Sequence, residues 1–283
     1  MCIRDSSMGA DILLNENMDF TIASNNLSEK EARYELVKTM RASILVLGPL
    51  VAKYGEARIA LPGGCAIGSR PVNYHLDALE QLGATITLKN GYIEASAKKL
   101  IGSKIKFDGI TVTGTENIMM AAVLAKGQSV LRNVAKEPEV QDLADFLNSM
   151  GAKISGAGTD EIVIDGVEDL SGTKFSVPAD RIEAGTYLIA AAITGGDVTI
   201  SNVRAPRMNN ILDKLKLSGA SINVGDNYIQ LIMESDSIIP VDISTAPFPG
   251  FPTDMQAQFT VLNALSEGSS VVTENVFENR SVS

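Results

Sequence analysis

The residue best suited to chemistry of its own is Cys65, which lies in a glycine-rich segment, Pro62–Pro71. Glycines on both sides of the cysteine leave the backbone open to close approach by a ligand. A free thiol has a pKa of about 8.5, and a neighbouring cation such as Arg70 would lower it, favouring a thiolate nucleophile or a thiol proton donor. The alternative is a buried and unreactive cysteine, a common state of this residue. The residues alone leave both alternatives open.

Basic side chains are concentrated around this segment. Residues 31–70 contain six basic and three acidic side chains, although the whole chain has a net charge of −10. Such an excess suits a small polyanionic ligand, because arginine matches phosphate and carboxylate groups with a planar fork. Arg33 and Lys53 are consistent with ordinary helix charges. Arg41 instead precedes an apolar run, on a helix that Gly48-Pro49 should bend or end, so it is predicted to face a specific partner.

Two junctions between a loop and a helix carry further candidates. Asp254 follows a Pro/Gly-rich loop at the start of a predicted helix, where a carboxylate is well placed as a general base. The alternative is that Asp254 or Thr253 caps this helix. The segment Thr111–Asn117 also opens a predicted helix, whose free N–H groups suit a phosphate.

A repeat indicates which elements position these residues. One marker is a helix ending in Leu-x-x-x-Gly-Ala before two short strands, and its glycines are 68 residues apart: Gly83, Gly151 and Gly219. Each of these glycines suits a left-handed helix C-cap. A second marker is an Ala- or Leu-rich helix closing on glycine, with spacings of 72, 69 and 72 residues: Gly55, Gly127, Gly196 and Gly268. The markers define an α/β unit of about 70 residues, namely strand, helix, strand, helix and hairpin.

The repeat is incomplete at both ends of the chain. Met8-Gly9-Ala10 and the two strands predicted after it resemble the tail of an earlier copy whose helices are absent, and the last copy stops after Arg280. Residues 1–6 show no periodicity and are interpreted as an assembly scar. The chain is therefore interpreted as a fragment.

Composition excludes several classes of partner. The net charge of −10 in 283 residues, without a long Lys/Arg block, argues against nucleic acid. The longest apolar stretch, Ala42–Ala52, is too short to cross a bilayer, and a cytoplasmic protein without a membrane partner is expected. Cys2 and Cys65 are the two cysteines, and neither has Cys or His neighbours at metal-ligand spacing. We expect no disulfide, metal or cofactor, and interpret His75 as a polar residue at a helix start.

Together these segments resemble the UDP-N-acetylglucosamine 1-carboxyvinyltransferases, a family of enolpyruvyl transferases that fosfomycin inhibits. The resemblance covers Ser7 to Arg280. It is most specific in six stretches: Leu36–Ser43, Leu61–Pro71, Thr113–Asn117, Asp180–Thr186, Phe251–Phe259 and Glu274–Arg280.

The resemblance implies a two-domain, inside-out α/β barrel built from repeated βαβαββ units, truncated in this chain. Each domain of the family has three such units with helices toward the core, and ligands bind between the domains. The cysteine-loop domain would comprise residues 7–178, and the second, incomplete domain residues 179–283.

The implied reaction joins phosphoenolpyruvate to the 3-hydroxyl of UDP-N-acetylglucosamine and releases phosphate, at the first committed step of peptidoglycan synthesis. Cys65 resembles the general acid at C3, which also forms a covalent adduct and is alkylated by fosfomycin. Asp254 resembles the base at the 3-hydroxyl.

The resemblance also assigns substrate-binding residues. Arg70 would contact phosphoenolpyruvate, and the strip from Arg70 to Tyr74 (Arg70, Pro71, Val72, Asn73 and Tyr74) would bind the uridine side. The remaining sugar-nucleotide contacts would come from Arg41, Thr113, Gly114, Val276 and Phe277. Asn73 and Tyr74 replace what is often Asp-Leu, a change expected to be tolerated where backbone groups make the contact.

Two other functions remain open. The sister enzymes that make 5-enolpyruvylshikimate 3-phosphate share the fold and mechanism but lack the cysteine loop, so Cys65 argues against them. A non-catalytic nucleotide-sugar-binding paralogue is the second. Because the family's Lys-Asn pair and further C-terminal arginine and aspartate contacts have no counterpart in this sequence, the 283-residue chain is expected to be inactive by itself.

Overall fold

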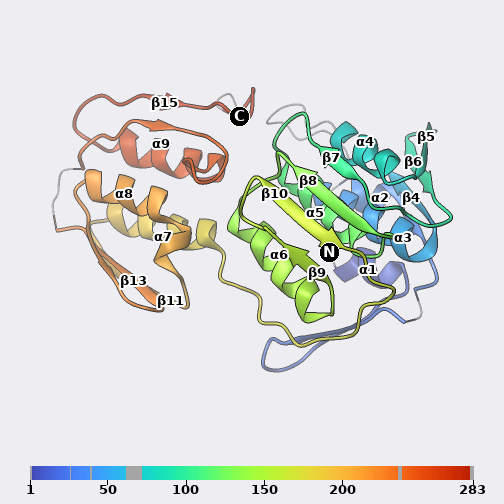
Figure 1. Ribbon diagram of the computed structural model, residues 1–283. Helices are drawn as coiled ribbons and strands as arrows, with labels where there is room; N and C mark the ends of the chain where they lie inside the picture. Colours follow the sequence, from blue (N-terminus) through green and yellow to red (C-terminus); the bar gives the residue numbers. More distant parts are fainter. Residues whose placement is uncertain (1, 26, 39, 62–71, 235–237, 281–283) are drawn as a thin grey trace. The chain divides into compact units, whose positions relative to one another are not determined.

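A computed structural model describes residues 2–25, 27–38, 40–61, 72–234 and 238–280 of the chain. Figure 1 shows its elements coloured along the sequence. The chain divides into two compact units. The described residues of the first unit extend to Thr173, except Lys136–Pro138, which group with the second unit, and the second unit continues from Lys174. The predicted domain boundary near residue 178 stays a prediction.

The first unit contains a sheet with the strand order β3-β4-β6-β5. Its strands are β3 (Glu31–Ala32), β4 (Glu56–Ala60), β5 (Thr85–Lys89) and β6 (Tyr92–Ser96). β3 and β4 are parallel, so the chain must cross over between them. The crossover consists of α2 (Tyr34–Val37), the 3₁₀-helix η1 (Arg41–Val46) and α3 (Leu47–Tyr54). A further helix, α4 (Asn73–Gln81), leads into the antiparallel hairpin β5/β6.

A second sheet in the same unit repeats this topology, with the order β7-β8-β10-β9. Its strands are β7 (Lys104–Lys106), β8 (Gln128–Arg132), β9 (Lys153–Ser155) and β10 (Glu161–Asp165). The helices are α5 (Val112–Ala122), between parallel strands β7 and β8, and α6 (Pro138–Ser149), before the hairpin. The predicted unit of strand, helix, strand, helix and hairpin is therefore confirmed twice.

The second unit contains a third copy with a shorter sheet, β11-β13-β12. Its elements are α7 (Arg181–Ile193), β11 (Asp197–Ser201), η2 (Ala205–Arg207), α8 (Asn209–Leu217), β12 (Ser221–Val224) and β13 (Tyr228–Ile232). A fourth copy begins with β14 (Ile243–Ser244), η3 (Thr253–Met255), α9 (Gln256–Ala264) and β15 (Val272–Thr273). Its two strands are parallel, as the first two strands of the unit are in the earlier copies.

The start of the chain differs from the sequence-based expectation. The hairpin of β1 (Asp11–Leu14) and β2 (Phe20–Ala23) forms as predicted. The expectation that no helix precedes it is wrong, because Cys2–Ser7 forms α1. The Ala10 N–H donates to the Asp5 carbonyl, which closes this helix as in the later copies. Six residues are too few for periodicity to reveal a helix.

The predicted left-handed C-caps are confirmed. Gly83, Gly151 and Gly219 have φ angles of 92°, 103° and 103°, and Gly9 repeats the feature with 101°. A residue without Cβ adopts this conformation at low cost and turns the chain from the helix into the hairpin. The recurring glycine therefore marks the same corner at each of these four positions.

Helices form the interior of the first unit. α5 packs against α3, α4 and η1, and Ile118, Met119, Ala121 and Ala122 on it are fully buried. A helix that is buried on nearly all sides must be apolar around most of its circumference. Strands β5 and β9 are by contrast mostly exposed. No helix in the described part of the chain is long and apolar enough to cross a membrane.

Candidate functional site

The structure describes nine of the twelve candidate residues. Cys65, Arg70 and Pro71 lie outside the described residues, so their roles stay predictions. The others form two groups, one in each compact unit. The group in the first unit is Arg41, Val72, Asn73, Tyr74, Thr113 and Gly114; the group in the second is Asp254, Val276 and Phe277.

In the first unit the candidate residues lie at the beginnings of three helices. Arg41 is the first residue of η1, Val72 is the N-cap of α4, and Thr113 lies in the first turn of α5. The expectation that the helix of Arg41 bends or ends at Gly48-Pro49 is confirmed. The 3₁₀-helix η1 ends at Val46 and α3 begins at Leu47, so Gly48 and Pro49 lie in the first turn of α3.

Asn117, a fully buried residue of α5, joins these three segments. Its Oδ1 accepts a hydrogen bond from the Gly48 N–H at 2.8 Å. Its Nδ2 donates to the Ile44 carbonyl at 3.1 Å and lies 3.0 Å from His75 Nδ1. One side chain thus binds η1, α3 and α4 to α5, because a buried amide must have partners for each of its polar atoms.

His75 connects Asn117 to Thr113, one of the candidate residues. Its ring is buried, with 2% of the residue exposed, and its Nε2 lies 3.4 Å from Thr113 Oγ1. Burial, together with the nearby positive charge of Arg41, lowers the pKa of His75 to about 4. The imidazole is therefore neutral at pH 7. The interpretation of His75 as merely a polar residue at a helix start understates its role, since it contacts the first turn of another helix.

Gly48 allows α3 and α5 to approach each other closely. A Cβ atom at this position would lie 2.5 Å from both the carbonyl oxygen and the Oδ1 atom of Asn117. No side chain fits at that distance without moving a backbone. The glycine therefore has a packing role at the base of the network.

The N–H groups in the first turn of α5 are not all available to bind an anion. Its N-cap is Thr111, whose Oγ1 accepts a hydrogen bond from the Gly114 N–H at 3.1 Å. The predicted helix at Thr111–Asn117 is confirmed, but one of its first N–H groups is already satisfied by the cap. A Cβ at Gly114 would lie 2.4 Å from the Thr111 methyl group, so the cap also restricts this position to glycine.

Part of the basic excess in residues 31–70 is neutralised within the described part of this segment. Arg58 forms ion pairs with Glu31 at 2.8 Å and Glu94 at 3.3 Å, and Lys38 pairs with Glu35. Two of the six cations are thus matched by carboxylates of the same unit. Arg41 lies close enough to His75 for its positive charge to lower the pKa of that histidine.

In the second unit Asp254 lies in η3, and its side chain is 60% exposed. The expectation that Asp254 or Thr253 caps the following helix by a side-chain hydrogen bond is wrong, because η3 begins after Pro252 and neither η3 nor α9 has a side-chain cap. Asp254 Oδ1 instead lies 2.8 Å from a terminal nitrogen of Arg280. The aspartate is therefore oriented by an arginine that is 26 residues later in the sequence.

Glu274 connects the remaining candidates of this unit. Its Oε1 accepts from the N–H groups of Val276 and Phe277 at 2.8 and 3.0 Å, and from the Thr245 hydroxyl at 2.9 Å. Its Oε2 accepts from the Thr253 hydroxyl at 2.9 Å. Burial acts to raise the pKa of Glu274, but these four hydrogen bonds outweigh it, so the net pKa is below the usual value.

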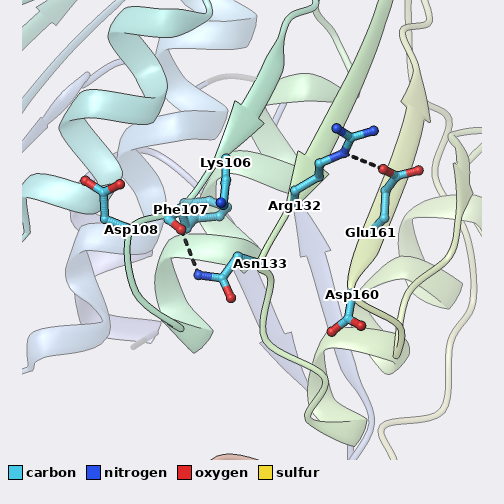
Figure 2. A pocket seen from close by; sticks show the side chains of 7 residues that line it. All are labelled: Lys106, Phe107, Asp108, Arg132, Asn133, Asp160 and Glu161. Atoms are coloured by element: carbon cyan, nitrogen blue, oxygen red, sulfur yellow. Dashed lines mark hydrogen bonds and ion pairs between the residues drawn. The ribbon is translucent and has the colours of Figure 1, made fainter.

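A hollow of about 660 Å³ lies elsewhere in the first unit (Figure 2). Its lining residues are Lys106, Phe107, Asp108, Arg132, Asn133, Asp160 and Glu161, which include none of the described candidates. Arg132 Nε and Glu161 Oε2 pair with each other at 2.6 Å. Charges of both signs line the hollow, so it does not select a polyanion. Among the described residues, no three histidine, cysteine, aspartate or glutamate side chains are placed to hold a metal ion.

No role was predicted for Asn117, Glu274 or Arg280, although each lies inside a stretch that carries the resemblance. One usable signal was present for Asn117. It is a polar residue beside Ile118 and Met119 on a helix that is otherwise mostly apolar, and a buried amide there requires partners. Glu274 and Arg280 offer no such signal, because charged residues near a loop are normally solvated.

Comparisons with known proteins support the resemblance. The sequence model of the family described as EPSP synthase (3-phosphoshikimate 1-carboxyvinyltransferase) matches residues 6–283. A UDP-N-acetylglucosamine 1-carboxyvinyltransferase of Hydrogenovibrio crunogenus is 54% identical over 275 residues, which are 97% of this chain and 66% of the relative. The protein of that name from Vesicomyosocius okutanii is 58% identical over 96% of this chain and 65% of the relative.

A solved structure matches the fold. The enolpyruvyl transferase NikO from Streptomyces tendae superposes with a TM-score of 0.85 at 22% sequence identity, covering 98% of this chain and 66% of that chain. This likeness confirms the predicted α/β fold with its repeated units. The chain spans 66% and 65% of the lengths of the two curated relatives described above.

Proposed function

The chain belongs to the EPSP synthase (3-phosphoshikimate 1-carboxyvinyltransferase) family, and from this premise we propose that the whole protein transfers the enolpyruvyl group of phosphoenolpyruvate to UDP-N-acetylglucosamine. The observation that carries the proposal is the identity of 54% and 58%, over nearly the whole chain, to relatives named UDP-N-acetylglucosamine 1-carboxyvinyltransferase. Cys65 adds support, because the shikimate-specific sister enzymes lack the cysteine loop. The proposed reaction is a cytoplasmic step of peptidoglycan synthesis.

The reaction proceeds by addition and then elimination. The oxygen of the sugar 3-hydroxyl bonds to C2 of phosphoenolpyruvate, its proton passes to the Asp254 carboxylate, and C3 takes a proton from the Cys65 thiol. C3 then loses a proton while the bond from C2 to the phosphate oxygen breaks, which restores the double bond and releases phosphate. Arg70 would neutralise the phosphoenolpyruvate anion, since arginine binds carboxylate and phosphate in a bidentate manner.

The geometry of the second unit supports Asp254 as the base. Its carboxylate is exposed, and the ion pair with Arg280 holds it in one orientation. A general base must lie within hydrogen-bonding reach of the proton it removes, and such positioning contributes substantially to its efficiency. Thr253, the neighbouring residue, is held by Glu274, which also binds the segment of Val276 and Phe277.

The proposal is tested in the whole protein by fosfomycin labelling and a phosphate-release assay. We expect a covalent adduct on Cys65, located by peptide mass spectrometry, and phosphate release that requires both UDP-N-acetylglucosamine and phosphoenolpyruvate. Phosphate release with shikimate 3-phosphate instead would identify the sister activity. An unlabelled Cys65 and no turnover with either acceptor would support a non-catalytic nucleotide-sugar-binding protein and overturn the proposal.

A further inference from the structure

The hydrogen bonds around Asn117 have a direction that the backbone dictates. The Gly48 N–H can only donate, so the Asn117 atom facing it at 2.8 Å is the oxygen Oδ1. The Ile44 carbonyl can only accept, so the atom facing it at 3.1 Å is the nitrogen Nδ2. Exchanging the two amide atoms would place a donor against a donor and an acceptor against an acceptor.

This orientation determines the tautomer of His75. The Nδ2 group of Asn117 has a second hydrogen, and it points at His75 Nδ1 at 3.0 Å. Nδ1 must therefore accept and carry no proton. Since burial and the charge of Arg41 keep the ring neutral, its single N–H proton resides on Nε2.

The tautomer in turn determines what the Thr113 hydroxyl can do. The Nε2–H of His75 donates to Thr113 Oγ1, 3.4 Å away. Because this oxygen accepts from the imidazole, its own proton is directed to another acceptor. Thr113 is partly exposed in the first turn of α5, so a ligand can reach the hydroxyl.

The hydrogen bonds that run from the Gly48 N–H through Asn117 and His75 to Thr113 form a relay. We infer that His75 is a positioning residue in this relay, which makes the Thr113 hydroxyl a hydrogen-bond donor to an acceptor oxygen of the bound nucleotide sugar. The identity of the ligand rests on the proposed function, whereas the direction of the relay does not. The relay prepares the donor before the ligand arrives, which lowers the cost of orienting it during binding.

The relay can be measured without any activity, because His75 is the single histidine of the chain. In protein labelled with ¹⁵N-histidine, a long-range ¹H–¹⁵N spectrum at pH 7 should show one neutral ring with the proton on Nε2. Replacing Asn117 by Asp, which cannot donate from the same position, should change the two nitrogen shifts. A wild-type ring protonated on Nδ1, or on both nitrogens, would overturn the inference even if the whole protein is an active transferase.

Two substitutions of His75 separate positioning from packing. Asparagine places an amide near the position of Nδ1 and does not reach Thr113, whereas glutamine places one near Nε2. In the whole protein, His75→Asn should weaken binding of UDP-N-acetylglucosamine about tenfold, measured by calorimetry, while His75→Gln should stay within about threefold of the wild type. Equal losses in both variants would indicate a packing role only and contradict the inference.

A double-mutant cycle with Thr113 completes the test. Thr113→Val removes the hydroxyl and should itself weaken binding about tenfold, and adding His75→Asn to it should cause no further loss, because the two residues act through the same hydrogen bond. The loss should appear in the KM for UDP-N-acetylglucosamine rather than in kcat. Independent, additive losses would overturn the relay. If the protein binds the nucleotide sugar but does not turn it over, the proposed function fails while the relay remains measurable.

Discussion

The carboxylate of Glu274 lies 2.9 Å from the Thr253 hydroxyl, next to the candidate base Asp254. The same carboxylate binds the N–H groups of Val276 and Phe277, so one side chain holds two candidate segments of the second unit together. Thr253 also accepts a hydrogen bond from Arg280, 3.0 Å away. Arg280 also pairs with the Asp254 carboxylate, so these contacts together set the surroundings of the candidate base.

Glu274→Gln should lower kcat of the whole protein about five- to tenfold and destabilise the fold by about 1 kcal/mol. The amide retains one acceptor oxygen for the backbone N–H groups but presents a donor to Thr253, whose hydroxyl already donates there. Steady-state phosphate release and urea unfolding measure the two effects. Glu267→Gln, at an exposed position of the same unit, is the matched control, and an equal effect there would refute the role of Glu274.

Asp254→Asn should lower kcat at least about 100-fold, because an amide cannot accept the proton of the sugar hydroxyl. The unfolding free energy should change by less than about 1 kcal/mol, since the ion pair with Arg280 is largely solvated on the aspartate side. Phosphate release and thermal unfolding provide the measurements. Asp226→Asn, in an exposed turn, serves as control; full activity of Asp254→Asn would exclude this aspartate as the base.

Gly48→Ala should destabilise the protein by about 1–3 kcal/mol, because the added Cβ would lie 2.5 Å from two oxygen atoms of Asn117. The change should also alter the ¹⁵N shifts of His75, since Asn117 must move. Gly172→Ala is the matched control in the same unit, as a Cβ at Gly172 meets nothing within 4 Å. Equal stability of the two variants in urea unfolding would show that the close approach of α3 and α5 is not required.

The stability of the first unit should depend on pH through His75. Its pKa of about 4 lies below the ordinary value of 6.5, so the unfolded chain takes up the proton first as the pH falls. The resulting stabilisation, about 3 kcal/mol, is fully present above pH 6.5 and is lost as the pH falls to about 4. Urea unfolding of the wild type and of the non-titrating His75→Gln should show the wild type losing more stability over this range. Parallel curves would contradict the shifted pKa.

Much of the architecture could be predicted from the sequence because its signals are local. A glycine after a helix adopts the left-handed conformation for reasons contained within a few residues, and the recurrence of Gly83, Gly151 and Gly219 therefore revealed the repeat and its hairpins. The short helix α1 escaped prediction since six residues carry no period. The 3₁₀-helix of Arg41 ends at Val46, directly before the turn that contains Gly48-Pro49, so this boundary could also be expected from local residues.

The sequence by itself determined the α/β repeat, the family and the types of residue available for catalysis. Only the tertiary structure decided which polar groups meet. His75 and Asn117 are 42 residues apart, and Glu274 and Thr245 are 29 apart, yet each pair shares a hydrogen bond. The physical reason is that a buried polar atom must find its partner among whatever the packing brings close, and sequence distance carries no information about that choice.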